Sequence, residues 1–147
     1  MHLTNLISFL CGRAAYLRLP GFLGPLSVRI FASACGVESA DAAQEIGAYR
    51  SIGDFFAREL RPGARPVGQG LVSPVDGVLR GRGQLGGGVI TDIKGCAYSA
   101  AELLGDEERA RVFHGGYYFN LYLSPRDYHH VHAPAAGRIV ECRRLPG

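Results

Sequence analysis

Several patterns that assign a chain to a common functional class are missing from this 147-residue sequence. None of its four cysteines belongs to a Cys-x-x-Cys pair, so neither a cysteine zinc site nor a disulfide framework is indicated. A GxxxxGK[ST] phosphate loop is absent, and there is no internal repeat or low-complexity tract. With 47% hydrophobic and 20% charged residues, the composition excludes a disordered polar tail and is typical of a folded domain.

Acidic residues are absent from residues 1–37, a segment that contains three arginines. The remaining basic residues are balanced by the 13 acidic residues, so the formal net charge of +3 arises entirely at the N-terminus. A nucleic-acid-binding domain carries a basic face across its whole surface. This distribution of charge therefore excludes nucleic acid as the expected partner.

Glycine and proline are abundant, with 21 and 8 residues, which indicates many turns and short elements. This favours a β-rich fold over a helical bundle. Apolar residues nevertheless recur at helical spacing near the N-terminus. We therefore expect an α+β fold, β-rich, in which amphipathic helices are followed by antiparallel strands.

The N-terminal helical pattern has an apolar stripe between Leu3 and Leu17 and ends at Pro20-Gly21, and a second short helix is predicted from Pro25. No uncharged run reaches the roughly 18 residues typical of a membrane span, because arginines interrupt it. The pattern leaves three interpretations open. The helix lies in the membrane interface with its arginines toward anionic headgroups, or covers the core, or belongs to an arginine-bearing targeting peptide.

Two capping boxes, in which a serine is followed three residues later by an acidic residue, predict helices. The first helix follows Ser51 and carries Phe55, Phe56 and Leu60, and the second follows Ser99. Alternating side chains predict a strand at residues 116–123, with a turn after it at Ser124-Pro125-Arg126-Asp127. Further strands are expected at residues 72–79, 89–94 and 137–145, with turns at Asp76-Gly77 and at residues 86–88.

Candidate chemistry lies in two places. Asp76 stands in an Asp-Gly pair between apolar runs, so it is either a turn residue or a functional carboxylate. Three of the five histidines, His129, His130 and His132, fall within four residues after Pro125. In an extended segment His130 and His132 share a face and His129 points away. The spacing fits either a metal-binding pair, His130 with His132, or a histidine oriented by Asp76 as general base toward a serine.

Four segments occur in the order found in phosphatidylserine decarboxylases, a family that the chain resembles from about Tyr49 to Gly147. The most specific segment is Tyr122-Leu-Ser-Pro-Arg-Asp-Tyr-His-His-Val-His-Ala-Pro134. The others are Phe55-Phe-Ala-Arg-Glu-Leu-Arg-Pro-Gly-Ala-Arg-Pro66, Ser73-Pro-Val-Asp-Gly77, and Ile93-Lys-Gly-Cys-Ala-Tyr-Ser99 with Leu103-Leu104-Gly105.

The resemblance implies a self-cleaving proenzyme with an Asp-His-Ser triad, whose serine becomes a pyruvoyl group. This covalent cofactor serves the conversion of phosphatidylserine to phosphatidylethanolamine in phospholipid biosynthesis. The match assigns the triad aspartate to Asp76 and the triad histidine to His132. It gives His129 a role in decarboxylation as a proton donor, and it implies no metal. His130 stands where the family usually has arginine.

The resemblance also implies two regions, a membrane-associating helical segment at residues 1–47 and part of the catalytic domain at residues 48–147. The second is expected to be a partial antiparallel β-sandwich or barrel, truncated at the C-terminus. No Gly-Ser cleavage site is present, so the chain alone is expected to be inactive and to require the C-terminal part, or smaller subunit, of the enzyme as a partner.

The other partners implied are phosphatidylserine and a membrane surface that contains anionic lipid. The expected location is peripheral on the bacterial inner membrane, with the mitochondrial inner membrane second. One alternative function is a non-catalytic membrane-binding module of the same fold. A metal hydrolase with histidine ligands ranks below it.

Overall fold

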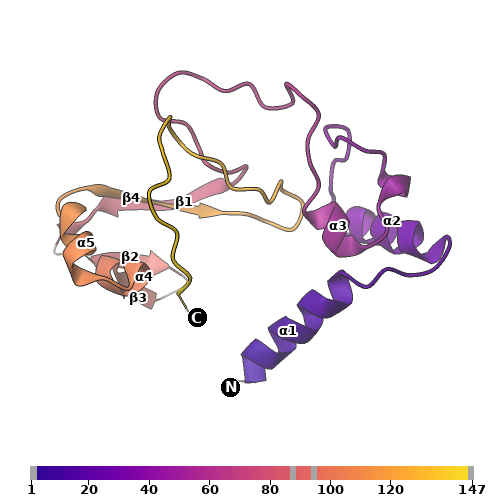
Figure 1. The fold of residues 1–147 in the computed structure, drawn as a ribbon, viewed down its shortest axis with the longest axis horizontal. Coiled ribbons are helices and arrows are strands. Elements are labelled where there is room, and N and C mark those ends of the chain that lie inside the picture. Colours follow the sequence, from indigo (N-terminus) through magenta and orange to yellow (C-terminus); the bar gives the residue numbers. More distant parts are fainter. Residues whose placement is uncertain (1–2, 87–88, 94–95, 146–147) are drawn as a thin grey trace. The chain divides into compact units, whose positions relative to one another are not determined.

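The computed structural model describes residues 3–86, 89–93 and 96–145 and has mixed secondary structure (Figure 1). The helices are α1 (Leu3–Ala15), α2 (Leu23–Cys35), the 3-10 helix η1 (Ile46–Ala48), α3 (Ile52–Phe56), α4 (Ala100–Leu104) and α5 (Glu107–Val112). The strands are β1 (Val78–Gln84), β2 (Val89–Ile93), β3 (Cys96–Ser99) and β4 (Tyr117–Tyr122). The predicted α+β class is confirmed.

The chain divides into two compact units. The helical unit contains Met1–Asp76 and Leu123–Ala135, and the strand unit contains Gly77–Tyr122 and Ala136–Gly147. This division follows contacts within the chain. The expected boundary between residues 47 and 48 separates two functions and stays a prediction.

The core of the helical unit forms where α2 packs against η1 and α3. Val28 and Ala32 on α2 are buried together with Tyr49 and Phe55. The Tyr49 and Phe55 rings meet edge to face at 5.2 Å between centroids, an arrangement that adds to the stabilisation from burial alone. Burial raises the pKa of the Tyr49 hydroxyl.

The local signals of the helices are partly confirmed. Ser51 caps α3 as predicted, because its hydroxyl accepts a hydrogen bond from the Asp54 N–H at 3.0 Å. The prediction that α3 carries Leu60 is wrong, since the helix ends at Phe56 and Leu60 forms an antiparallel bridge with Ala42. A Cβ at Gly53 would lie 2.6 Å from the Tyr16 ring, so a larger residue there requires that ring to move.

The strand unit contains two small antiparallel sheets. β1 pairs with β4 from Val78↔Tyr122 to Gln84↔Tyr117, with a bulge between Leu79 and Gly81, and β2 pairs with β3. The strand expected at residues 116–123 is confirmed as β4. Over the described ranges these sheets do not close into a barrel.

Of the strands expected at residues 72–79 and 137–145, the first is confirmed only after the Asp76-Gly77 turn and the second is wrong. Residues 72–77 are not a strand, and pairing starts only at Val78, because the bend around Asp76 turns the backbone away from a ladder. Residues 137–145 have no strand pairing either; here Glu141 and Arg143 form ion pairs instead. The turn expected at residues 86–88 and the end of the strand at Lys94 fall largely outside the described residues.

Helix α4 has both halves of its predicted capping box, since the Ser99 hydroxyl accepts from the Glu102 N–H and the Glu102 carboxylate accepts from the Ser99 N–H. Helix α5 was not predicted. Its signal was present, because Asp106 accepts a hydrogen bond from the Arg109 N–H at 3.1 Å as N-cap and acidic residues follow in the first turn.

Candidate functional site

The Asp76 turn lies beside the histidine segment in the helical unit. The Val72 N–H donates to the Pro134 carbonyl at 2.9 Å, and the His132 N–H donates to the Pro74 carbonyl at 2.8 Å. The Ser73 hydroxyl donates to the Val75 carbonyl at 2.7 Å and tightens the bend. These bonds join two segments that are far apart in the sequence. The backbone bonds thereby hold the segment that contains Asp76 next to the segment that contains His132.

The carboxylate of Asp76 is held by an arginine. Arg65 Nε donates to Asp76 Oδ2 at 2.6 Å, and Arg65 Nη1 donates to Asp41 Oδ2 at 2.7 Å. In the part of the chain that the structure describes, no hydrogen bond joins the Asp76 carboxylate to the His132 ring. The arrangement therefore brings the two predicted residues together without a direct bond between their side chains.

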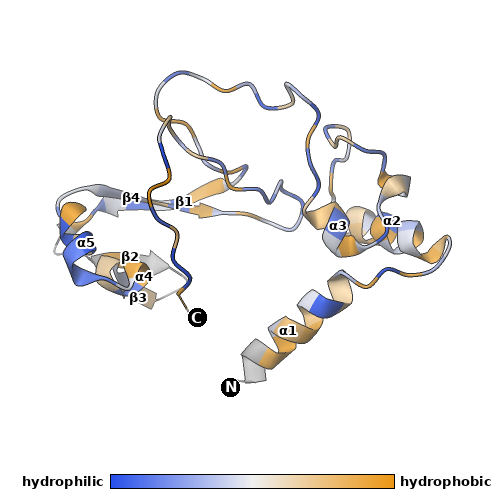
Figure 2. Cartoon of the chain, in the orientation of Figure 1, coloured by the Kyte–Doolittle hydropathy of each residue, from blue (hydrophilic) through white to orange (hydrophobic). Residues whose placement is uncertain are grey.

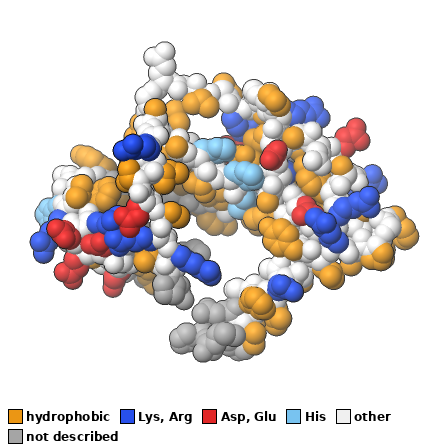
Figure 3. All heavy atoms as spheres, in the orientation of Figure 1, with side chains coloured by type: hydrophobic (Ala, Val, Ile, Leu, Met, Phe, Trp, Pro, Cys, Tyr) orange, Lys and Arg blue, Asp and Glu red, His pale blue; other side chains and the backbone are white. Residues whose placement is uncertain are grey.

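Alternate residues of the histidine segment stack on one another. The Tyr128 ring lies 4.9 Å from the His130 ring and 5.6 Å from the His132 ring, centroid to centroid, and both pairs are nearly parallel. His130 Nε2 donates to the Ala57 carbonyl at 3.1 Å. His130 and His132 thus share a face, as their spacing predicts, and Figure 3 shows histidine side chains gathered on the surface.

His129 lies against a different neighbour. Its ring packs on Phe56 at 3.9 Å between centroids, and its Nδ1 is 3.0 Å from the Asp127 carbonyl oxygen. A carbonyl only accepts hydrogen bonds, so Nδ1 carries the hydrogen. Nε2 is then the nitrogen of His129 that gains or loses a proton.

The turn before the histidines is confirmed and is built on a buried arginine. The Asp127 N–H donates to the Ser124 carbonyl at 2.9 Å, and the Ser124 N–H donates to Asp127 Oδ2 at 2.7 Å. Arg58, only 4% exposed, donates through Nη2 to the carbonyls of Arg126 and Asp127 and lies over the Phe55 ring. Burial lowers the pKa of the Arg58 guanidinium.

Arg58 is a site residue that sequence reasoning missed. It stands in the quoted run from Phe55 to Pro66, but nothing in that run separates it from the exposed arginines nearby. Its role depends on carbonyl groups that come from the other end of the helical unit.

A hollow of 610 Å³ opens beside Asp76 and His132. The bend that carries Asp76 forms one wall, and Tyr128, His132 and Ala133 form another. His132 is exposed and Asp76 is partly buried. The two side chains therefore border a space that an incoming group can enter.

The spacing of His130 and His132 also left a metal-binding pair open. Within the described ranges, no group of three or more histidine, cysteine or acidic side chains is placed to hold a metal ion. His130 Nε2 is already bonded to the Ala57 carbonyl. The pair of His130 and His132 thus lacks a third ligand among these residues.

Comparison with known proteins identifies one family. The family model described as "Phosphatidylserine decarboxylase" matches residues 52–147. A phosphatidylserine decarboxylase proenzyme of Anaeromyxobacter sp. (strain K) is 40% identical over 97% of this chain and 51% of its own length. Proenzymes of Myxococcus xanthus (strain DK1622), 40% identical, and Verminephrobacter eiseniae (strain EF01-2), 43% identical, match over 96% and 92% of this chain. The chain spans about half the length of the curated relatives it matches.

Proposed function

Because the chain belongs to the phosphatidylserine decarboxylase family, we propose that it supplies the proton-transfer residues of an enzyme that converts phosphatidylserine to phosphatidylethanolamine. The observation that carries this proposal is the backbone bond from His132 to Pro74, which sets the imidazole beside the Asp76 bend at one hollow. The decarboxylase is a carboxy-lyase of phospholipid biosynthesis, made as a proenzyme.

Asp76 and His132 act first, in self-cleavage. His132 takes the proton from a serine hydroxyl, and Asp76 orients the imidazole and stabilises the cation that forms. The 147 residues contain no Gly-Ser site, so the hydroxyl comes from the half of the family's proteins that this chain does not match. On this proposal the chain alone does not decarboxylate.

The residues present fit a pyruvoyl group. The hollow of 610 Å³ leaves room for a residue between the Asp76 bend and the Tyr128–Ala133 segment. A pyruvoyl group supplies a ketone that accepts the electrons left by the departing carboxyl group. His132 and Asp76 border the space in which that group forms.

His129 acts in the decarboxylation itself. The bond from Nδ1 to the Asp127 carbonyl and the contact with Phe56 fix the ring and leave Nε2 to carry the exchangeable proton. Protonated Nε2 donates to the substrate carbon that has lost carbon dioxide. His129 is therefore separate in function from His132.

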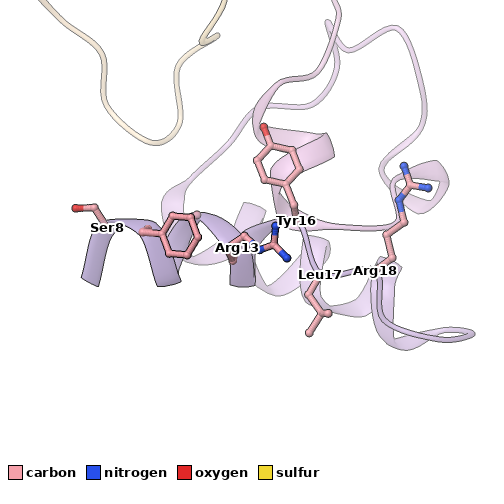
Figure 4. A pocket seen from close by; sticks show the side chains of 7 residues that line it. Ser8, Arg13, Tyr16, Leu17 and Arg18 are labelled. Atoms are coloured by element: carbon pink, nitrogen blue, oxygen red, sulfur yellow. The ribbon is translucent and has the colours of Figure 1, made fainter. Parts of the chain in front are cut away.

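The helical unit also carries the surface that binds the membrane in which the phospholipid substrate lies. Large apolar side chains of α1, α2 and the loop between them face solvent, among them Phe9, Leu10, Phe22 and Ile30, and Figure 2 shows both helices as largely hydrophobic. A groove of 850 Å³ at the end of α1 is lined by Phe9 and Leu17 together with Arg13 and Arg18, and in Figure 4 Leu17 points away from the side taken by Tyr16.

This surface suits the interface of a membrane with anionic lipid, where apolar side chains enter the acyl boundary and arginines meet phosphate groups. No helix in the described residues is long and apolar enough to cross a bilayer. Peripheral association, on the bacterial inner membrane in preference to the mitochondrial one, is part of this proposal. Membrane association without catalysis is the alternative function, that of a non-catalytic membrane-binding module.

The catalytic proposal is tested with a fusion of this chain to the C-terminal half of the Anaeromyxobacter relative. We expect the fusion to cleave itself and to form phosphatidylethanolamine, and the 147-residue chain to form none. His132→Gln should remain uncut, and His129→Gln should be cut but inactive. His114→Gln, at an exposed histidine of the strand unit, is the matched control and should behave as wild type. Turnover by the chain alone, or cleavage of His132→Gln, contradicts the proposal.

Membrane binding is tested by flotation with vesicles. The chain should float with vesicles that contain phosphatidylglycerol, and replacing Arg13, Arg18 and Arg29 by alanine should weaken binding by about 1 kcal/mol per arginine at low salt. Replacing Arg80, Arg82 and Arg111 of the strand unit removes the same charge and is the control. Equal loss in both triple variants contradicts a specific role for the N-terminal arginines.

A further inference from the structure

One arginine connects Asp76 to a second acidic residue in the helical unit. Arg65 Nε donates to Asp76 Oδ2 at 2.6 Å, while Nη1 donates to Asp41 Oδ2 and to the Ala64 carbonyl, both at 2.7 Å. The bonds to Asp41 and then to Asp76 raise the pKa of the Arg65 guanidinium. The Arg65 guanidinium therefore remains protonated at any pH at which the two carboxylates are ionised.

The Asp41 end of the bridge is fixed by the backbone. The Arg61 N–H donates to the Asp41 carbonyl, and the Ala43 N–H donates to the Glu59 carbonyl, each at 2.8 Å. Residues 41–43 and 59–61 thus run side by side as a short antiparallel pair. Asp41 is an anchored point from which Arg65 reaches the Asp76 bend.

The other charged groups near Asp76 are engaged elsewhere or are not bonded to it. A hollow of 380 Å³ is lined by Arg65 and Asp76 with Glu38, Asp41, Arg58, Arg126 and Asp127. Arg58 is used by two carbonyls, and the Asp127 carboxylate accepts the Ser124 N–H. His132 faces the rings of Tyr128 and His130. In the described part of the chain, Arg65 is the arginine that hydrogen-bonds Asp76.

We propose that Arg65 is a positioning residue for Asp76, which it holds through Oδ2 so that Oδ1 is left to meet the imidazole of His132. This inference rests on the proposed function. The guanidinium also offsets the negative charge of Asp76, which by itself favours a protonated imidazole. The neutral imidazole is the form that accepts a proton from the serine hydroxyl.

The test uses NMR titration of the 147-residue chain. Arg65→Gln should move the titration midpoints of the Asp76 carboxyl and the His132 imidazole upward, because a neighbouring cation is lost. Arg65→Lys keeps the charge and should restore at least half of each shift. The Arg65 side chain is 44% exposed, so these changes leave no buried cavity.

The control is Arg18→Gln, which removes a positive charge from the exposed pair of Arg18 and Asp54 in the same unit. It should leave both midpoints within about 0.1 unit, since Arg18 pairs with Asp54 and salt screens an exposed charge. A His132 midpoint that does not rise in Arg65→Gln overturns the inference.

A further variant separates this inference from the proposed function. Asp76→Asn should lower the His132 midpoint, because it removes the carboxylate that favours the imidazolium. If it does so while Arg65→Gln has no effect, the inference about Arg65 fails and the pairing of Asp76 with His132 stands. If Asp76→Asn leaves His132 unchanged, that pairing, and with it the proposed function, is overturned.

Discussion

Each unit of the molecule contains a cluster of arginines and carboxylates, and the two clusters differ in what surrounds them. In the strand unit, Asp106 and Glu141 pair with Arg109 and Arg143 on an exposed surface. In the helical unit, Arg65 pairs with Asp41 and Asp76 at the edge of two hollows and beside a stack of aromatic and imidazole rings.

The comparison shows that ion pairing alone does not mark a functional site. The strand-unit cluster joins residues 141–143 to the start of α5, where Asp106 is the N-cap, so its role is accounted for by local structure. Exposed pairs of this kind contribute little to stability. The Asp76 pair differs because a titratable imidazole and an open space lie next to its carboxylate. Predictions can therefore contrast equivalent changes in the two units.

The largest contrast is expected between Asp76→Asn and Asp106→Asn in the fusion protein described above. Asp76→Asn should slow self-cleavage by about ten-thousand-fold, since the imidazole loses the carboxylate that orients it. Asp106→Asn removes the same charge from the strand unit, and asparagine still caps α5. Its rate, measured by the appearance of the two subunits on a gel, should equal that of wild type. If both variants cleave themselves at similarly reduced rates, the two clusters do not differ in function and the prediction is wrong.

A smaller contrast concerns the two cores. Phe55 is fully buried in the helical unit, and Leu85 is 5% exposed in the strand unit. Phe55→Ala should destabilise the helical unit by about 3–5 kcal/mol, by loss of transfer free energy and by the cavity left behind. Hydrogen exchange should then show lost protection at residues 128–132, with little change at β1 and β4. The reverse pattern is expected for Leu85→Ala, and uniform loss of protection in both variants would show that the units unfold together.

The smallest effect is the pH dependence of the strand-unit cluster. Hydrogen bonds from Arg143 and then Arg109 lower the pKa of Glu141 below its ordinary value of 4.5. A lowered pKa in the folded state means that the stabilisation is present above pH 4.5 and is lost as the pH falls through the folded-state value. Urea unfolding of Glu141→Gln should lack this part of the acid dependence. Identical acid dependence in wild type and variant would contradict it.

Local sequence signals predicted those elements whose determining contacts lie within a few residues. The reciprocal bonds of Ser99 and Glu102 close within one turn, so α4 begins where the capping box places it. The alternation in Tyr117–Tyr122 also identified β4, although its hydrogen-bond partner β1 lies more than 30 residues earlier in the chain. Helix α5 was missed although the sequence contains its N-cap residue, Asp106.

Elements that depend on a distant partner were predicted less well. Residues 72–77 and 137–145 have apolar residues suited to strands, but a strand also requires a neighbour with which to exchange backbone hydrogen bonds. At the first segment, Val72 meets Pro134 and the chain then bends at Asp76. At the second, the described residues provide no paired strand.

The sequence by itself determined the family, the order of the motifs, the capped helices, and the candidate residues Asp76, His129 and His132. Only the tertiary structure decided that Arg65 holds the Asp76 carboxylate and that Arg58 is buried beneath the turn of the histidine segment. The physical reason is that a cap is made by bonds across a few residues and alternation is written in the sequence itself, whereas these contacts arise when remote segments meet. Their geometry depends on the path of the whole chain.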